Sequence, residues 1–279
     1  MVKIGKIQKM KVNNIEKMGA YLDSGTGYRE DNILLPKSQL TKDVKEGDEI
    51  EVFIYRDSED RLIATTKKPY GQVEELAYLK AVDETTIGAF MDIGLERDLF
   101  LPFREQKYTI EIGKKYLVNI YLDKSERLCA STNIYQYLKD NSPYVQDDRV
   151  IGIVYDIKPG VGIFVAVDKI YRGLIPEKEN FKKLKCGEEI ETRVIRVRED
   201  GKLDLSMREK SYIQMDTDSE MIFNELKKNR GFLELNDKSS PEDIKRKLNM
   251  SKKSFKRAVG RLLKENKIIF SNGGIKLVK

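Results

Sequence analysis

Residues 162–165 read Gly162-Ile163-Phe164-Val165, a glycine followed by an aromatic ring between two aliphatic side chains. The same order, with Ala or Ile after the glycine, occurs at Gly88-Ala89-Phe90-Met91 and at Gly19-Ala20-Tyr21-Leu22, so the pattern recurs roughly every 70 residues. Alternation of this kind favours a β-strand with one buried face. The sequence therefore predicts three copies of one small β unit.

The same flanking elements surround each copy. The preceding strands are predicted at Lys3–Ile7, Gly71–Leu76 and Arg149–Val154. A Leu/Ile-Pro step follows at Leu35-Pro36, Leu101-Pro102 and Ile175-Pro176, and a later strand begins at a glycine in Gly47–Val52, Gly113–Val118 and Gly187–Val194. A last hairpin turns at Glu59-Asp60, Ser125-Glu126 and Asp200-Gly201. Five short strands without a long helix predict a closed barrel, which leaves no sheet edge unpaired.

The last quarter of the chain changes to helical spacing. Glu220–Asn229 has this periodicity, Ser240-Pro241-Glu242-Asp243 is a helix start with a serine cap and an early proline, and Met250-Ser251 opens a third helix. Two strand-like runs follow at Lys267–Phe270 and Ile275–Val278. Helix, helix, helix and hairpin is the order of a winged helix-turn-helix.

The β units, and above all the third with its hairpin Gly201–Met207, resemble the S1 RNA-binding domain, an OB-fold. Three such units followed by a winged helix resemble the bacterial conserved virulence factor B family over nearly the whole chain. The predicted fold class is mainly β and multidomain, with three tandem S1/OB-fold five-stranded barrels followed by a small α+β winged helix-turn-helix domain. The resemblance implies RNA binding and an indirect effect on virulence-type gene expression.

The predicted domains are three S1-like domains at 1–67, 68–140 and 146–210 and a winged-helix domain at 217–279. A short helical segment at Ile134–Lys139 and the break Asn141-Ser142-Pro143 separate the second domain from the third. The polar segment Ser211–Asp218 is predicted to be the linker to the last domain.

Composition excludes several classes of enzyme. The chain has no histidine and only two cysteines, Cys129 and Cys186, so it lacks the residues for a Cys/His zinc site, a disulfide framework or a histidine-dependent triad. No P-loop, Cys-x-x-Cys or Gly-x-Ser-x-Gly sequence occurs either. The chain is predicted to be a non-enzymatic protein without a cofactor or metal.

The N-terminal residues Met1–Ile7 alternate like a strand instead of forming the apolar block of a signal peptide, and no long apolar run suits a membrane span. The expected location is the cytoplasm, away from membranes, and a monomer is the favoured state.

Strand parity places three aromatic residues on the solvent side of the barrels, namely Tyr21, Phe90 and Phe164. A ring beside a glycine offers a platform on which a nucleobase can stack. The alternative is that these rings pack under loops or against a neighbouring unit.

The S1 resemblance also implies an acidic and a basic residue around the final hairpin. Carried over by position, these are Asp57 with Arg61, Asp123 with Arg127, and Arg198 with Lys202, so the third unit has no acid at the first position. Two usual S1 contacts are absent from every unit. Met18, Ile87 and Val161 stand where many S1 domains have a second aromatic residue, and Pro36, Pro102 and Pro176 stand where histidine is common. Each barrel should therefore bind weakly, with affinity supplied by linkage.

The net charge of +6 comes from the tail, where residues 216–279 carry 16 Lys and Arg against 9 Asp and Glu. In the third tail helix, Lys253, Arg257, Arg261 and Lys264 cluster opposite an apolar stripe that contains Phe255 and Val259. This basic face is suited to a phosphate backbone, or it is an ordinary solvated surface.

Three functional interpretations follow from these features. The first is a single-stranded RNA binder that acts in post-transcriptional regulation or RNA turnover. The second is a DNA-binding transcriptional regulator led by the winged helix, and the third is a protein-interaction adaptor on the ribosome or the RNA-decay machinery. The number of barrels favours RNA.

Overall fold

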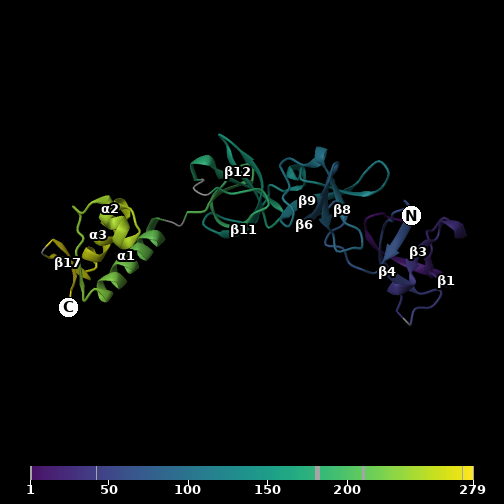
Figure 1. Cartoon of the computed structure of the whole chain (residues 1–279), viewed down its shortest axis with the longest axis horizontal. Coiled ribbons are helices and arrows are strands. Elements are labelled where there is room, and N and C mark those ends of the chain that lie inside the picture. Colours follow the sequence, from purple (N-terminus) through teal and green to yellow (C-terminus); the bar gives the residue numbers. More distant parts are fainter. Residues whose placement is uncertain (1, 42, 180–182, 209–210, 272, 279) are drawn as a thin grey trace. The chain divides into compact units, whose positions relative to one another are not determined.

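The computed structural model describes residues 2–41, 43–179, 183–208, 211–271 and 273–278 (Figure 1). The chain divides into two compact units, Met1–Met207 and Arg208–Lys279. The first unit contains three closed five-stranded barrels, and the second contains three helices and a three-stranded sheet within its described residues. The predicted fold class is confirmed. The predicted domain ends at residues 1, 210 and 279 lie outside the described residues.

The three barrels share one strand order. Barrel 1 consists of β1 (Ile7–Glu16), β2 (Gly19–Leu22), β3 (Ile33–Pro36), β4 (Glu49–Arg56) and β5 (Leu62–Thr65). Barrel 2 consists of β6 (Leu76–Thr85), β7 (Gly88–Asp92), β8 (Leu99–Pro102), β9 (Lys115–Leu122) and β10 (Leu128–Ser131). Barrel 3 consists of β11 (Arg149–Lys158), β12 (Gly162–Val167), β13 (Tyr171–Pro176), β14 (Glu189–Val197) and β15 (Leu203–Ser206). In each barrel the third and fifth strands are parallel and close the sheet.

A glycine is required at the start of the second strand of every barrel. Gly19, Gly88 and Gly162 have φ values of +155°, +157° and +142°, which L side chains rarely adopt. A Cβ at any of them would collide with the carbonyl oxygen of Leu35, Leu101 or Ile175 in the adjacent strand. The glycine of the repeated pattern therefore lets the second and third strands approach closely.

Two of the three predicted first strands are wrong. Strand β1 begins at Ile7 and β6 at Leu76, so Lys3–Ile7 and Gly71–Leu76 precede the ladders instead of forming them. The chain bends before each strand, because Gly5 has a φ of +74° and Glu74 a φ of +66°. Alternation of apolar residues does not reveal these bends. The prediction for Arg149–Val154 is confirmed, since these residues begin β11.

Barrels 2 and 3 are joined by an apolar cluster and a charged contact. Leu117 of barrel 2 and Ile153 and Tyr155 of barrel 3 are buried together with Ile134 and Leu138 from the connecting segment. The predicted short helix at Ile134–Lys139 is a single 3-10 turn, Tyr135–Tyr137. Arg172 of β13 holds this segment, with Nη1 2.7 Å from the Asp140 carboxylate and its guanidinium 4.1 Å from the Tyr135 ring centre.

The second unit has the expected winged-helix order. It contains α1 (Ser211–Lys228), β16 (Phe232–Leu233), α2 (Pro241–Leu248), α3 (Lys252–Lys264), β17 (Ile268–Ser271) and β18 (Gly274–Leu277). The two predicted caps are confirmed, because the Ser240 side chain accepts from Asp243 N–H and that of Ser251 accepts from Ser254 N–H. The predicted linker Ser211–Asp218 is wrong, since this segment is the first part of α1. Its polar composition concealed a helix whose second half is amphipathic, with Ile222 and Leu226 buried.

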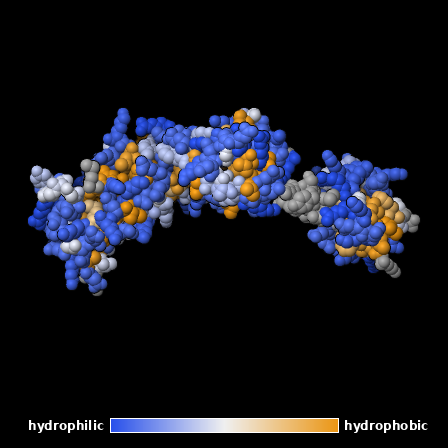
Figure 2. All heavy atoms as spheres, turned by 180° about the vertical axis from the view of Figure 1, so that it is seen from behind, coloured by the Kyte–Doolittle hydropathy of each residue, from blue (hydrophilic) through white to orange (hydrophobic). Residues whose placement is uncertain are grey.

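Hydrophilic residues cover most of the face visible in Figure 2, with apolar patches between them on both units. In the part of the chain that the structure describes, no helix has the length and apolar character needed to cross a membrane.

Candidate nucleic-acid interface

The three predicted aromatic residues occupy equivalent places on the outer side of the barrels. Tyr21 in β2, Phe90 in β7 and Phe164 in β12 are each partly exposed, whereas the residues on either side of them in these strands are buried. Because neighbouring side chains in a strand point to opposite faces, each ring lies on the outer face of its barrel. Strand parity thus located the three rings correctly.

An exposed apolar side chain lies three residues before each ring. Met18, Ile87 and Val161 are 67%, 63% and 47% exposed. These are the positions where the sequence lacks the second aromatic residue of many S1 domains. Each barrel therefore has an exposed apolar side chain in place of a second ring, which keeps apolar surface and removes one stacking surface.

The surroundings of the three rings differ. Phe90 packs beside Phe100 of β8, with ring centres 5.3 Å apart. Phe164 lies 6.1 Å from the Tyr155 ring, contacts the apolar cluster between barrels 2 and 3, and has Lys158 Nζ 5.2 Å from its centre. Tyr21 faces Leu34 across the sheet. Phe164 thus combines exposure with a packing role.

In barrel 1, the predicted acid and base contact each other. The Arg61 side chain donates to the Asp57 carboxylate from Nε at 3.0 Å and from Nη2 at 2.8 Å. Asp57 also accepts from the backbone N–H groups of Glu59 and Arg61, which shapes the hairpin turn. Partial desolvation of the carboxyl is outweighed by these hydrogen bonds, so the pKa of Asp57 lies below its usual value.

In barrel 2, Asp123 has the same turn-forming role, but Arg127 is directed to a different partner. Asp123 accepts from the backbone N–H of Ser125 and of Arg127. The Arg127 guanidinium donates to Asp60 in the hairpin of barrel 1, with Nε 2.6 Å from Oδ1. Arg56 of barrel 1 forms an ion pair with Glu126 of barrel 2 in return. Two ion pairs therefore hold the hairpins of these barrels together.

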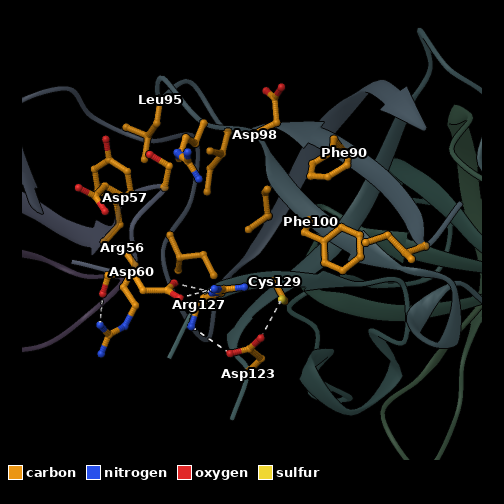
Figure 3. Close-up of a pocket in the computed structure, with 17 residues that line it drawn as sticks. Arg56, Asp57, Asp60, Phe90, Leu95, Asp98, Phe100, Asp123, Arg127 and Cys129 are labelled. Carbon is orange, nitrogen blue, oxygen red and sulfur yellow. Dashed lines mark hydrogen bonds and ion pairs between the residues drawn. The ribbon is translucent and has the colours of Figure 1, made fainter. Parts of the chain in front are cut away.

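A pocket of about 380 Å³ lies at this junction (Figure 3). Figure 3 shows Phe90 and Phe100 on one side and the hairpin residues, Arg127 among them, on the other. Four of the separately predicted residues therefore line a single pocket, namely Asp57, Phe90, Asp123 and Arg127. Burial, with the nearby carboxylates Asp92 and Asp83, raises the pKa of Asp98, which also lines the pocket.

Charge decides what the pocket can accept. Four aspartates and three arginines line it, and two of the arginines, Arg56 and Arg127, are held by Glu126 and Asp60. This balance does not favour a phosphate. The apolar wall formed by Phe90 and Phe100 is better suited to the flat face of a base.

In barrel 3, an acid is present two residues beyond the position inferred from the resemblance. Asp200 lies 3.3 Å from Arg198 Nη2 and 3.0 Å from Lys202 Nζ. The hydrogen bond from Lys202 lowers the pKa of Asp200. The hairpin therefore keeps an acid between its two bases, and both bases pair with it.

The basic residues predicted on α3 lie opposite its buried side. Phe255, Ala258, Val259 and Leu262 are buried in the core of the second unit. Lys253, Arg257 and Lys264 are exposed. Arg261 is only partly exposed and its Nε donates to Glu265 at 2.7 Å. Three cations of the predicted four thus extend into solvent, and the fourth has a carboxylate partner.

Phe100, Arg97 and Asp60 also line the pocket, although the sequence did not predict them as site residues. Phe100 could have been found by parity, because Leu99 and Leu101 beside it in β8 are both buried. Asp60 and Arg97 carry no such signal, since they are exposed polar residues near a turn or loop and acquire a neighbour only when two barrels meet.

Comparison with known proteins supports both the fold and the class of domain. Residues 4–67 and 72–133 match the S1 domain, residues 134–209 match the second domain of virulence regulatory factor CvfB, and residues 220–277 match the CvfB-like winged helix domain. The S1 domain is a nucleic-acid-binding domain, and S1 and winged-helix domains are typically non-enzymatic.

Similar proteins extend over nearly the whole chain. The uncharacterized protein YitL of Bacillus subtilis is 32% identical over 95% of this chain and 90% of its own. Conserved virulence factor B of Staphylococcus aureus is 28% identical over 99% of this chain and 94% of its own. A crystal structure from Streptococcus pneumoniae, described as a multidomain protein with nucleic acid binding domains, is 25% identical with a TM-score of 0.55 and covers 99% of this chain and 98% of that one. With three S1-type barrels followed by a CvfB-like winged helix, the chain belongs to the conserved virulence factor B family.

Proposed function

We propose that the chain binds single-stranded RNA and acts in post-transcriptional regulation or RNA turnover. The rings of Tyr21, Phe90 and Phe164 would stack on bases. The charged residues of the barrel hairpins would lie beside the RNA strand. The exposed cations of α3 would hold phosphates. The cytoplasm is the proposed location and a monomer the proposed state.

The observation that carries this proposal is the recurrence of one apolar platform on all three barrels. Each platform combines a partly exposed ring with an exposed aliphatic side chain three residues earlier. A flat apolar surface can contact a base only where the base is unstacked. Bases in a duplex are already stacked on each other, so three such platforms favour a single strand.

The second unit supports a different candidate, a DNA-binding regulator. Its α3 carries exposed cations on the side away from the core, as a helix that enters a major groove does. The same cations suit the backbone of a single strand, which has the same phosphate groups. An adaptor that binds a protein of the ribosome or the RNA-decay machinery is the third candidate.

One comparison separates the three candidates. Fluorescence anisotropy of the full chain is measured with a single-stranded RNA, a DNA of the same sequence and the corresponding duplex DNA, all at one salt concentration. We expect the tightest binding to the RNA. Preference for the duplex would favour the DNA regulator, and equally weak binding to all three would favour the adaptor.

A further inference from the structure

Gly260 lies within α3, four residues before its last residue Lys264. Glycine destabilises the interior of a helix relative to alanine, because it loses more backbone freedom on folding. Packing does not require a glycine here, since a Cβ built at Gly260 has no atom of the described structure within 4 Å. The side chain is therefore missing at a site where the protein itself has room for one.

The neighbours of Gly260 are cations. An open hollow of about 560 Å³ is lined by Arg257, Gly260, Arg261, Lys264 and Glu265. Glu265 provides the carboxylate of this lining. It forms ion pairs with two cations of the protein, Arg261 Nε at 2.7 Å and Lys267 Nζ at 2.8 Å. Hydrogen bonds from Lys267 and Arg261 lower the pKa of Glu265, so its charge is compensated within the protein.

Arg257 and Lys264 stand one helical turn before and one after Gly260, on the same side of α3. Both are exposed. An anion that spans the two cations must pass over the helix backbone at residue 260. A side chain at this position would hold the anion away from the helix axis and lengthen both contacts.

We propose that Gly260 is a close-approach site for the sugar-phosphate backbone of a nucleic acid. One nucleotide unit lies against the bare backbone of α3, with its flanking phosphates on Arg257 and Lys264. This inference rests on the proposed function and assigns the winged helix a defined role in it. The loss of helix stability at Gly260 is retained because it allows the contact.

The test uses the full chain with two substitutions of increasing size, Gly260→Ala and Gly260→Gln. Both residues are good helix formers, so the melting temperature of the second unit should rise by roughly 2–6 °C. Affinity for a single-stranded RNA should nevertheless fall, by about 3-fold for alanine and about 10-fold or more for glutamine. Stability and binding would thus change in opposite directions.

Asn224→Ala is the matched control. Asn224 is exposed in α1, and alanine there also raises helix stability, but it adds no atoms beside Arg257 and Lys264. This variant should bind RNA as the parent chain does. Arg257→Gln serves as the reference for loss of a phosphate contact.

The outcomes separate this inference from the proposed function. Parent-like binding by Gly260→Gln would overturn the inference, and if Tyr21→Ala still weakens binding the proposed function stands. Absence of RNA binding by the parent chain would overturn both. Equal losses with RNA and with a DNA of the same sequence would support contact with the shared phosphodiester backbone, and a loss with RNA alone would support contact with the ribose hydroxyl.

Discussion

The guanidinium of Arg127, in the hairpin of barrel 2, donates to the carboxylate of Asp60, in the hairpin of barrel 1, with Nε 2.6 Å from Oδ1. Position in the S1 pattern predicts Arg127 to be a nucleic-acid contact. In the structure it joins two barrels, and Arg56 with Glu126 forms a second ion pair between the same hairpins. A phosphate that contacts the Arg127 guanidinium must share this guanidinium with the Asp60 carboxylate.

The Asp60 carboxyl should titrate below its usual range, because the hydrogen bond from Arg127 lowers its pKa. A carboxyl with a lowered pKa in the folded state stabilises the fold above its unfolded pKa, and this contribution is lost as the pH falls through the folded value. NMR titration of the carboxyl carbon measures the pKa directly. In Arg127→Gln it should move upward toward the ordinary value.

The control for this titration is Arg104→Gln. Arg104 is an exposed arginine of barrel 2 that lies near Glu105. Its removal should leave the Asp60 titration unchanged. An unchanged pKa in Arg127→Gln would show that the two hairpins are not joined by this pair in solution.

Tyr21→Ala should weaken RNA binding by about 1–3 kcal/mol, the contribution of one stacked base. Because Tyr21 lies on the outer face of β2, its removal should change the free energy of unfolding by about 1 kcal/mol or less. Anisotropy titration and urea denaturation measure the two effects. Tyr28→Ala removes an exposed ring outside the strands of barrel 1 and should lower the affinity less.

Phe164→Ala should affect stability as well as binding. The ring contacts Tyr155 and the apolar cluster between barrels 2 and 3, so we expect a loss of up to about 3 kcal/mol in the free energy of unfolding. This differs from the uniform behaviour that strand parity predicts for the three rings. A Phe164→Ala chain as stable as the parent would assign the ring to binding alone.

Replacing Lys253, Arg257 and Lys264 with glutamate should flatten the salt dependence of RNA binding. Each phosphate contact on a single strand contributes roughly −0.7 to the slope of log affinity against log salt, so three contacts account for about −2. Arg261 is left in place because Glu265 already engages it. Helix content, measured by circular dichroism, should be unchanged, since none of the three side chains is buried.

A variant with the same change in charge at Lys228, Lys238 and Lys276 is the control, because these lysines are exposed in the same unit outside α3. If the slope of log affinity against log salt were equal in the α3 variant and the parent chain, the basic face would be a binding surface for a partner other than RNA. Removal of residues 208–279 should give at least as large a loss. A cut at residue 217 would divide α1 and is unsuitable.

The purified chain should bind unstructured RNA without cleaving it, with or without Mg²⁺ or Mn²⁺. Among the described residues, no group of three or more acidic or cysteine side chains is placed to hold a metal ion. Gel analysis of labelled RNA over several hours provides the measurement. Metal-dependent cleavage that persists through purification and is lost in a carboxylate variant would contradict this prediction.

The sequence by itself determined the fold class and much of the local structure. Glycine at the start of the second strand, as at Gly162, is required by a positive φ and by the adjacent carbonyl, and burial of Ile163 and Val165 follows from alternation. The caps Ser240 and Ser251 were equally readable, because a cap depends on residues three positions apart. These features depend on residues close together in the chain, so the spacing of residue types in the sequence predicts them.

Only the tertiary structure decided which candidate residues act together. Asp57 and Phe90 belong to different barrels and line one pocket, and Arg127 is held by Asp60 across the same junction. Sequence periodicity does not predict contacts of this kind, because they depend on how one closed barrel packs against the next. The polar start of α1 at Ser211 was hidden for a related reason, since its surroundings rather than its own composition decide whether a polar segment is helical.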